Sequence, residues 1–146
     1  MSTVVRPYLK PLPKVDEFNK PFFDMLKQHV FSVPRCSDCG DYGWVPYPAC
    51  RSCHSTRLTW TPVSGKGEVY SYTVVYRGPG AFGEEVPYVI CMGRLDERPR
   101  SCIVGANMVD VDPFEVAIGM RIKIAFEDIP AEDSTMWRWA PRGDEV

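Results

Sequence analysis

Four cysteines in two Cys-x2-Cys pairs constrain this chain more than any other feature of its sequence. Ten residues separate the two pairs, and Gly40 follows the first pair, where such a turn often needs a left-handed backbone. Each turn brings two thiolates together, and two facing turns complete the tetrahedral shell that zinc prefers. The spacing therefore predicts one structural zinc ion held by Cys36, Cys39, Cys50 and Cys53. Four thiolates leave no position for a catalytic water.

The cysteine pattern also allows structures other than a four-cysteine zinc site. The four clustered cysteines could form two disulfides or stay as free buried thiols, and one Cys-x2-Cys pair alone can act as a dithiol switch. His54, beside Cys53, could replace a cysteine as ligand. Cys91 and Cys102 lie in apolar stretches, where we expect small core residues rather than nucleophiles. Because the N-terminus does not have a secretory pattern, a reducing cytoplasm is the expected compartment.

Size and charge predict one globular unit with a modest core. The chain has 146 residues, 45% of them hydrophobic, and 17 Lys and Arg against 19 Asp and Glu. A metal would help such a small core. No cluster of basic residues stands out, which argues against sequence-independent binding to nucleic acid. No run of about 18 apolar residues occurs, so we expect no ordinary membrane-spanning helix.

The N-terminal segment changes character near Asp16. Residues 1–14 contain three prolines and no apolar periodicity, which indicates an extended arm that gains order only by lying on another surface. The next residues predict an amphipathic helix with an apolar stripe at Phe18, Phe22, Phe23, Met25, Leu26 and Val30. Asp16 is a candidate N-cap, but Pro21 fits only a first turn, so the regular helix should start nearer Asn19. The stripe either packs on the domain or forms a docking or ligand face.

The rest of the chain has the pattern of short strands. The segment 68–76 places β-branched and aromatic residues on both faces, as a central strand does, and a Gly-rich loop follows at 77–83. The other predicted elements are strands at 58–62, 88–94, 101–108 and 121–126, a helical turn at 112–115, and a last strand through Trp137 and Trp139. We therefore predict a mainly β fold with three parts. These are an N-terminal arm and helix (1–34), a zinc ribbon (35–62) and a five-stranded barrel of the OB type (63–146).

Catalytic groups are scarce. His29 and His54 are the two histidines, and neither belongs to a nucleophile or metalloprotease motif. The Gly-rich loop is not a dinucleotide fingerprint, because a strand rather than a helix follows it. Glu84 and Glu85 in this loop could act as acid or base, although a solvated charged loop is the more common outcome. The sequence therefore predicts no independent catalysis.

Several separated motifs together resemble the DUF35 family, also described as acyl-CoA-associated OB-fold proteins with a rubredoxin-like zinc ribbon. The helix and the two cysteine pairs precede a Gly-x-Gly-Glu-Val-Tyr-Ser-Tyr-Thr-Val-Val strand. The likeness then continues in order through Val86-Pro-Tyr-Val89, Arg94-Leu-Asp-Glu97, Ile118-Gly-Met120 and Ala125-Phe-Glu-Asp128. It covers nearly the whole chain.

The resemblance implies a non-catalytic accessory subunit that binds a thiolase-superfamily partner. The complex, of thiolase or aldolase type, would make or break carbon–carbon bonds in coenzyme A thioesters, such as aromatic or steroid side-chain thioesters. In such complexes the partner supplies the nucleophile or base. For the surface that faces the partner or acyl-CoA, exposed aromatic and Arg residues are the candidates: Phe18, Phe22, Phe23, Trp44, Tyr47, Arg77, Phe82 and Tyr88.

Two other functions stay open from the sequence. Zinc ribbons and OB barrels also bind single-stranded nucleic acid through a basic groove and stacking aromatic residues, but a basic groove is not evident here. The chain could also bind acyl-CoA unaided, with Arg77, Arg98 and Arg100 as candidates to contact the phosphates.

Overall fold

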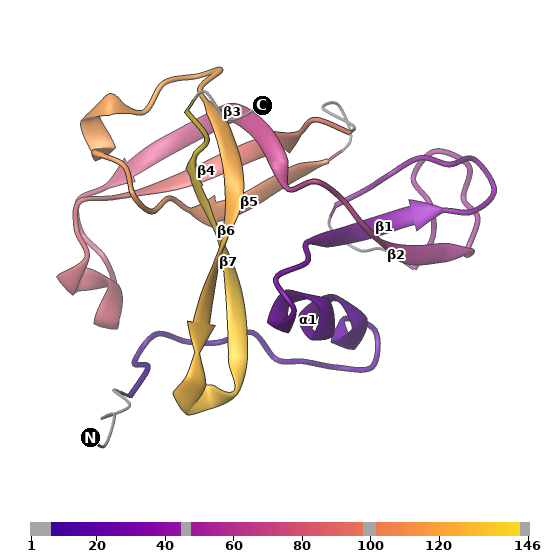
Figure 1. The fold of residues 1–146 in the computed structure, drawn as a ribbon, viewed down its shortest axis with the longest axis horizontal. Helices are drawn as coiled ribbons and strands as arrows, with labels where there is room; N and C mark the ends of the chain where they lie inside the picture. The colour runs from indigo at the N-terminus through magenta and orange to yellow at the C-terminus, as the bar shows by residue number, and fades with distance from the viewer. Residues whose placement is uncertain (1–6, 45–47, 98–101, 144–146) are drawn as a thin grey trace.

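The computed structural model describes residues 7–44, 48–97 and 102–143, which form a short helix, a two-stranded ribbon and a five-stranded sheet (Figure 1). The helix and strands are α1 (Lys20–Lys27), β1 (Ser32–Cys36), β2 (Leu58–Pro62), β3 (Lys66–Val75), β4 (Tyr88–Leu95), β5 (Ile103–Asn107), β6 (Arg121–Ile129) and β7 (Ser134–Pro141). Three 3-10 turns lie at Gly80–Glu84, Pro113–Glu115 and Pro130–Glu132. The predicted mainly β fold is confirmed.

Helix α1 begins where Pro21 allows it to begin. Pro21 lies in the first turn, where its missing N–H costs nothing, and Asn19 is the N-cap. The Asp16 carboxylate instead accepts from the amides of Phe18 and Asn19, so it caps the turn before the helix. The helix ends before Val30, because His29 has a left-handed φ of 59°. Within the described ranges no helix is long and apolar enough to cross a membrane.

The large sheet has the strand order β5-β4-β3-β6-β7, with neighbouring strands antiparallel. A parallel bridge between Met108 and Trp139 brings the two edge strands together, and the Val109 amide donates to the Trp139 carbonyl over 2.8 Å. This order agrees with the predicted OB-type barrel, and β3 is the central strand that the sequence predicts. The predicted helical turn also occurs, with the Asp112 carboxylate accepting from the Phe114 amide.

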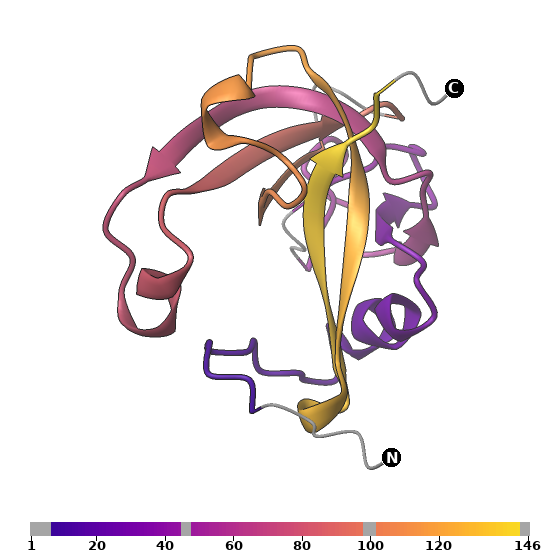
Figure 2. The same cartoon turned by 60° about the vertical axis from the view of Figure 1, so that its left-hand side comes forward.

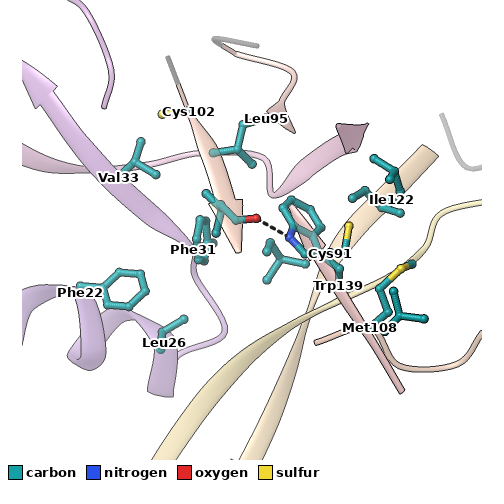
Figure 3. Close-up of a cluster of buried hydrophobic side chains, with 14 of the residues drawn as sticks. Phe22, Leu26, Phe31, Val33, Cys91, Leu95, Cys102, Met108, Ile122 and Trp139 are labelled. Carbon is teal, nitrogen blue, oxygen red and sulfur yellow. Dashed lines mark hydrogen bonds between the residues drawn. The ribbon is translucent and has the colours of Figure 1, made fainter. Parts of the chain in front are cut away.

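The barrel core forms around Trp139, which is fully buried (Figure 3). Its indole N–H donates to the Val104 carbonyl over 2.9 Å, so the buried polar atom has a partner. A Cβ at Gly93 would lie 2.5 Å from two ring carbons of Trp139. Because Gly93 has no side chain, the Trp139 indole can pack directly against the backbone of β4.

An aromatic cluster joins α1, the ribbon and the barrel. The Phe22 ring lies 5.2 Å from Trp137, 5.3 Å from Trp44 and 5.3 Å from Trp60, measured between ring centroids. The apolar stripe of α1 thus packs on the rest of the chain, which is one of the two roles left open by the sequence. The division at 34/35 and 62/63 stays a prediction, and β1 begins at Ser32, before the first boundary.

Candidate metal centre

The four cysteines of the two pairs lie together at the far end of the ribbon. The Sγ atoms of Cys36, Cys39, Cys50 and Cys53 are all within 4.8 Å of one another. Across the two pairs, the Sγ atoms of Cys36 and Cys53 lie 3.6 Å apart, and those of Cys39 and Cys50 also lie 3.6 Å apart. Zinc–sulfur bonds of about 2.3 Å in a tetrahedron separate sulfurs by about 3.8 Å. The cluster therefore fits a tetrahedral metal ion.

The two turns have the same backbone construction. In each, the first cysteine's amide donates to the carbonyl five residues later, and the residue after the second cysteine donates back to the first cysteine's carbonyl. The bonds are Cys36 to Asp41 (2.9 Å), Gly40 to Cys36 (2.9 Å), Cys50 to Ser55 (2.7 Å) and His54 to Cys50 (2.9 Å). Gly40 and His54 both have a left-handed φ, of 77° and 65°. The left-handed residue expected after the first pair is present, and His54 has the same position in the second turn.

Polar side chains connect the two turns to each other. The Ser55 hydroxyl and the Arg57 guanidinium donate to the Asp38 carboxylate. The Ser52 hydroxyl donates to the Asp41 carboxylate. Each of these carboxylates belongs to the first turn region and each hydroxyl to the second, so the bonds hold the turns in the geometry that the sulfurs need.

The electrostatics of the sulfurs favour a bound cation. The backbone amide of Cys39 lowers the pKa of the Cys36 thiol to about 6. The Ser55 amide favours the Cys53 thiolate, but the neighbouring sulfurs, that of Cys36 first, raise the pKa of Cys53 to about 12. One thiolate thus opposes ionisation of the next. A cation among the four sulfurs removes that repulsion and lets all four coordinate as thiolates.

Other sulfur and imidazole groups stay outside the centre. His54 is exposed and does not belong to the cluster of ligand atoms found among the described residues. Cys91 and Cys102 are buried in the barrel, as the sequence predicts for core residues, and burial raises the pKa of each thiol to about 12. Thiols with such a high pKa are poor nucleophiles.

Some residues of the predicted partner surface are buried in the structure, and others are exposed. Phe22 and Phe23 are buried in the core, so these two side chains are not exposed as that prediction requires. Phe18 is 48% exposed, and Trp44 is partly buried against the core. Arg77 is exposed in the Gly-rich loop. Tyr47 of this surface, and Arg98 and Arg100 of the phosphate contact, lie outside the described residues.

The N-terminal arm and the residues just after the Gly-rich loop meet at a cleft that the sequence does not predict. The cleft has a volume of about 450 Å³, and Tyr88, Met108 and Phe126 are among its lining residues. Phe82 packs on Tyr88, with ring centroids 5.9 Å apart. Of the predicted surface residues, Tyr88 lines the cleft and Phe82 packs on Tyr88, while Arg77 does not line it.

Lys10 and Arg138 supply the positive charges of the cleft. The Lys10 ammonium lies 2.8 Å from the Glu85 carboxylate, and the Arg138 guanidinium lies 2.8 Å from Glu127 and donates to the Tyr8 hydroxyl. Burial opposes the charged form of Lys10, but the hydrogen bond to Glu85 raises its pKa. The arm thus lies on the chain's own barrel (Figure 2), and Glu85 is an ion-pair partner. Nothing in the Pro-rich sequence around Lys10 indicates this contact.

Comparisons of sequence show what the chain is similar to. The sequence model of a family described as "ChsH2, C-terminal OB-fold domain" matches residues 60–127. A DUF35 domain-containing scaffold protein of Methanocaldococcus jannaschii is 35% identical over 65% of this chain and 66% of its own length. The 3-oxo-4,17-pregnadiene-20-carboxyl-CoA hydratase alpha subunit of Mycobacterium tuberculosis is 32% identical over 82% of this chain. This chain spans only 36% of that subunit.

Comparison of structures agrees with the sequence relatives. A solved structure described as "Ltp2-ChsH2(DUF35) aldolase" contains a chain that superposes with a TM-score of 0.77 and 27% identity. The alignment covers 89% of this chain and 98% of that chain. The ribbon with its four-cysteine cluster and the five-stranded sheet are what the family resemblance predicts. The chain belongs to the DUF35/ChsH2 C-terminal OB-fold family.

Proposed function

We propose that this chain is a zinc-binding accessory subunit, without catalytic groups of its own, of a thiolase-superfamily complex of the thiolase or aldolase type. The complex makes or breaks carbon–carbon bonds in acyl-CoA substrates. The observation that carries the proposal is the match to 98% of a chain in the solved structure described as "Ltp2-ChsH2(DUF35) aldolase". A likeness of that extent includes both the ribbon and the barrel.

The substrate class is proposed from the same relatives. Aromatic and steroid side-chain thioesters are the substrates we favour, and a relative named as a hydratase of a pregnadiene carboxyl-CoA supports the steroid class. The barrel does not offer a nucleophile for this chemistry among its buried thiols, because Cys91 and Cys102 have raised pKa values. In this proposal the partner supplies the nucleophile and the base.

The metal of the ribbon is proposed to be a structural zinc ion. Cys36, Cys39, Cys50 and Cys53 would hold it, because four thiolates in a tetrahedron suit zinc and complete its shell. The ion would act as a cross-link between the two turns. The chain's own contribution is to orient the sulfurs through the amide bonds of the turns and the two carboxylate bridges at Asp38 and Asp41.

The proposed partner surface keeps the exposed or partly exposed members of the predicted set. Phe18, Trp44, Arg77, Phe82 and Tyr88 remain in it. Phe18 presents an aromatic ring near the ribbon, where its carbonyl accepts from the Trp60 indole over 3.1 Å. Arg77 and Phe82 belong to the loop before β4. Aromatic and Arg side chains are the residues that carry most binding energy in protein interfaces.

Co-purification followed by reconstitution tests the proposal. The tagged chain is isolated from its native cells, its metal content is measured, and associated proteins are identified by mass spectrometry. We expect about one zinc per chain and a thiolase-superfamily protein. The purified partner should then cleave or form acyl-CoA carbon–carbon bonds faster with the chain than without it. A chain that changes neither the activity, the solubility nor the stability of any thiolase-like protein would contradict the proposal.

Matched charge reversals locate the surface. Arg77→Glu should weaken the partner complex, because an exposed loop cation becomes an anion within the proposed interface. Arg121→Glu makes the same charge change at an exposed residue of β6, outside the proposed surface, and should leave binding unchanged. Equal effects of the two variants on binding would contradict the placement of Arg77 in the interface.

A salt titration separates this function from single-strand binding. The cations of the cleft, Lys10 and Arg138, are both engaged by carboxylates, which is unlike an open basic groove. We expect weak binding to a labelled single-stranded oligonucleotide. Tight binding that falls steeply with salt concentration would favour the nucleic-acid function instead.

A further inference from the structure

The two halves of β3 have different neighbours. The first half pairs with β6 through Lys66, Gly67 and Glu68, and backbone bonds link Val69 to the loop before β6. After an irregularity between Val69 and Ser71, the segment Ser71–Val75 continues to pair with β4. On its other side, no strand pairs with Ser71–Val75 in the described part of the chain. Figure 2 shows this half of β3 arching away from β6.

The second half of β3 is largely exposed along this edge and on the face of Ser71 and Thr73, whereas Val74 on the other face packs against the core. Residues 70–73 are all exposed, with Tyr70 at 50% and Tyr72 at 36%. The β4 residues paired with Ser71 and Thr73 are Met92 and Ile90, which are 38% and 37% exposed. The face of Ser71 and Thr73 is therefore not covered within one chain, although the sequence pattern is that of a strand covered on both faces.

The chemistry of this edge favours strand addition. Alternate residues of a strand direct their N–H and C=O groups away from the paired neighbour, so an edge offers them to another strand. Proteins usually protect such edges with Lys, Pro or inward-pointing charges. The segment from Tyr70 to Tyr76 has none of these residues. It consists of aromatic, β-branched and Ser residues, which suit a pleated sheet.

We infer that Ser71–Val75 pairs antiparallel with the same segment of a second copy of this chain, around a two-fold axis at Thr73. In that register Tyr70 of one copy faces Tyr76 of the other, and Tyr72 faces Val74. Aromatic pairs and aromatic–β-branched pairs are favourable across strands. A single self-complementary patch is what a two-fold symmetric dimer requires.

Charge also favours this antiparallel arrangement of two copies. The uncharged segment is flanked on one side by Glu68, whose carboxylate also pairs with Arg94 of its own chain, and on the other side by Arg77. Antiparallel pairing brings the Arg77 end of one copy to the Glu68 end of its partner, whereas parallel pairing would align like charges. Continuous pairing across the two copies would join two five-stranded sheets through the central strand β3 of each.

Sedimentation velocity of the full-length, metal-loaded chain over a range of concentrations tests the inference. We expect a reversible monomer–dimer equilibrium. Amide hydrogen exchange in Ser71–Val75 should slow as the concentration rises, while exchange in β7 should not change. A chain that remains monomeric at every concentration would overturn the inference.

Thr73→Lys is the variant aimed at the two-fold axis. Because the axis places residue 73 opposite itself, two ammonium groups would face each other, and the dimer should weaken by roughly tenfold or more. Thr56→Lys adds the same charge at an exposed site of the ribbon and should leave the dimer intact. A dimer equally stable in both variants would place the interface elsewhere.

Cross-linking keeps the test decisive if Thr73→Lys does not fold. Mild oxidation of Thr73→Cys by diamide should link two chains through one disulfide, with diamide taking up the two electrons and two protons. Glu115→Cys, exposed and outside β3, is the matched control and should give no added cross-link. Protection of Ser71–Val75 that arises only with a thiolase-like partner, and not with concentration, would overturn the inference and assign the edge to that partner. The proposed accessory function would stand in that case.

Discussion

The ribbon tip and the barrel are ordered by different means. In the barrel, Val69, Leu95, Val104, Ile122 and Trp139 are completely buried. Among the described residues between 37 and 57, Cys50 is the one buried residue, and the rest are exposed or partly buried. The barrel thus has an apolar core, whereas the ribbon tip has four sulfurs and a few polar bridges. The comparison teaches that one chain can couple its folding to apolar burial in one region and to a ligand in another.

Metal removal should break the ribbon and spare the barrel. Structural zinc contributes about 10–16 kcal/mol of apparent binding free energy to small metal-dependent folds. A chelator, or Cys50→Ser, should therefore remove amide protection from residues 36–57 while β4 and β7 keep theirs. Hydrogen exchange with mass spectrometry, before and after chelation, makes the measurement.

The control for metal removal is re-addition of zinc, which should restore protection in the chelated wild-type chain but not in Cys50→Ser. Simultaneous loss of protection in both regions would show that the barrel also depends on the metal. The ribbon and the barrel would then not differ in their dependence on the metal.

Loss of the Trp139 side chain should instead destabilise the barrel. Trp139→Ala removes a fully buried side chain and leaves the Val104 carbonyl without its indole donor, so the barrel should lose about 3–5 kcal/mol. Urea unfolding followed by far-ultraviolet circular dichroism measures this loss. Trp60→Phe, a partly buried change at β2, is the milder control. Unfolding free energies that match in the two variants would contradict a core centred on Trp139.

The sequence predicted those features that depend on local spacing or alternation. The cysteine pairs have a spacing that suits only a few structures, and Gly40 marks the left-handed residue of the first turn. Alternating β-branched and aromatic residues predicted β3, and Asp112-Pro113 predicted the capped turn. Each of these signals lies within about ten residues.

Features that depend on distant contacts could not be predicted in the same way. The spacing of Phe22 and Phe23 shows that α1 has an apolar stripe, but not whether the stripe meets the chain's own Trp137 or another protein. Lys10 and Glu85 are 75 residues apart, and nothing local connects them. His29 ends α1 through a left-handed backbone that histidine rarely adopts.

The two turns of the metal centre offer a sharper contrast on a smaller scale. Gly40 and His54 have equivalent left-handed backbones, which cost a residue with a Cβ about 1–2 kcal/mol. Gly40→Ala should therefore weaken the centre by about 1 kcal/mol, and His54→Gly should strengthen it by a similar amount. Competition with a chromogenic chelator measures both changes.

The opposite signs of these two changes are the informative result. A side-chain role for His54 as a metal ligand would reverse the second sign, because His54→Gly would then release the ion more easily. His54→Ala separates the effects, since it removes the imidazole and retains the Cβ. It should resemble the wild-type chain in its affinity for zinc.

The smallest effect concerns the contact of His29 with β6. The His29 ring stacks on Phe126 with centroids 4.8 Å apart, and its Nε2 lies 2.9 Å from the Asp128 carboxylate. The hydrogen bond from His29, followed by that from Thr135, lowers the pKa of Asp128. A carboxyl whose folded pKa is lowered stabilises the fold above its unfolded pKa, and the contribution disappears as pH falls through the folded pKa.

Asp128→Asn should therefore be less stable than the wild-type chain near neutral pH, and the difference should shrink below about pH 4. Thermal melts of both proteins across that range measure it. Because acid also releases metal from thiolates, only the difference between the two proteins at each pH is used. Asp133→Asn loses the same charge at the adjacent turn and serves as the control, because its carboxylate is 95% exposed and its ion pair with Lys27 of α1 is a surface pair that contributes little. A stability difference for Asp128→Asn that stays constant down to the lowest pH would show that the ionised carboxylate does not hold α1 to the barrel.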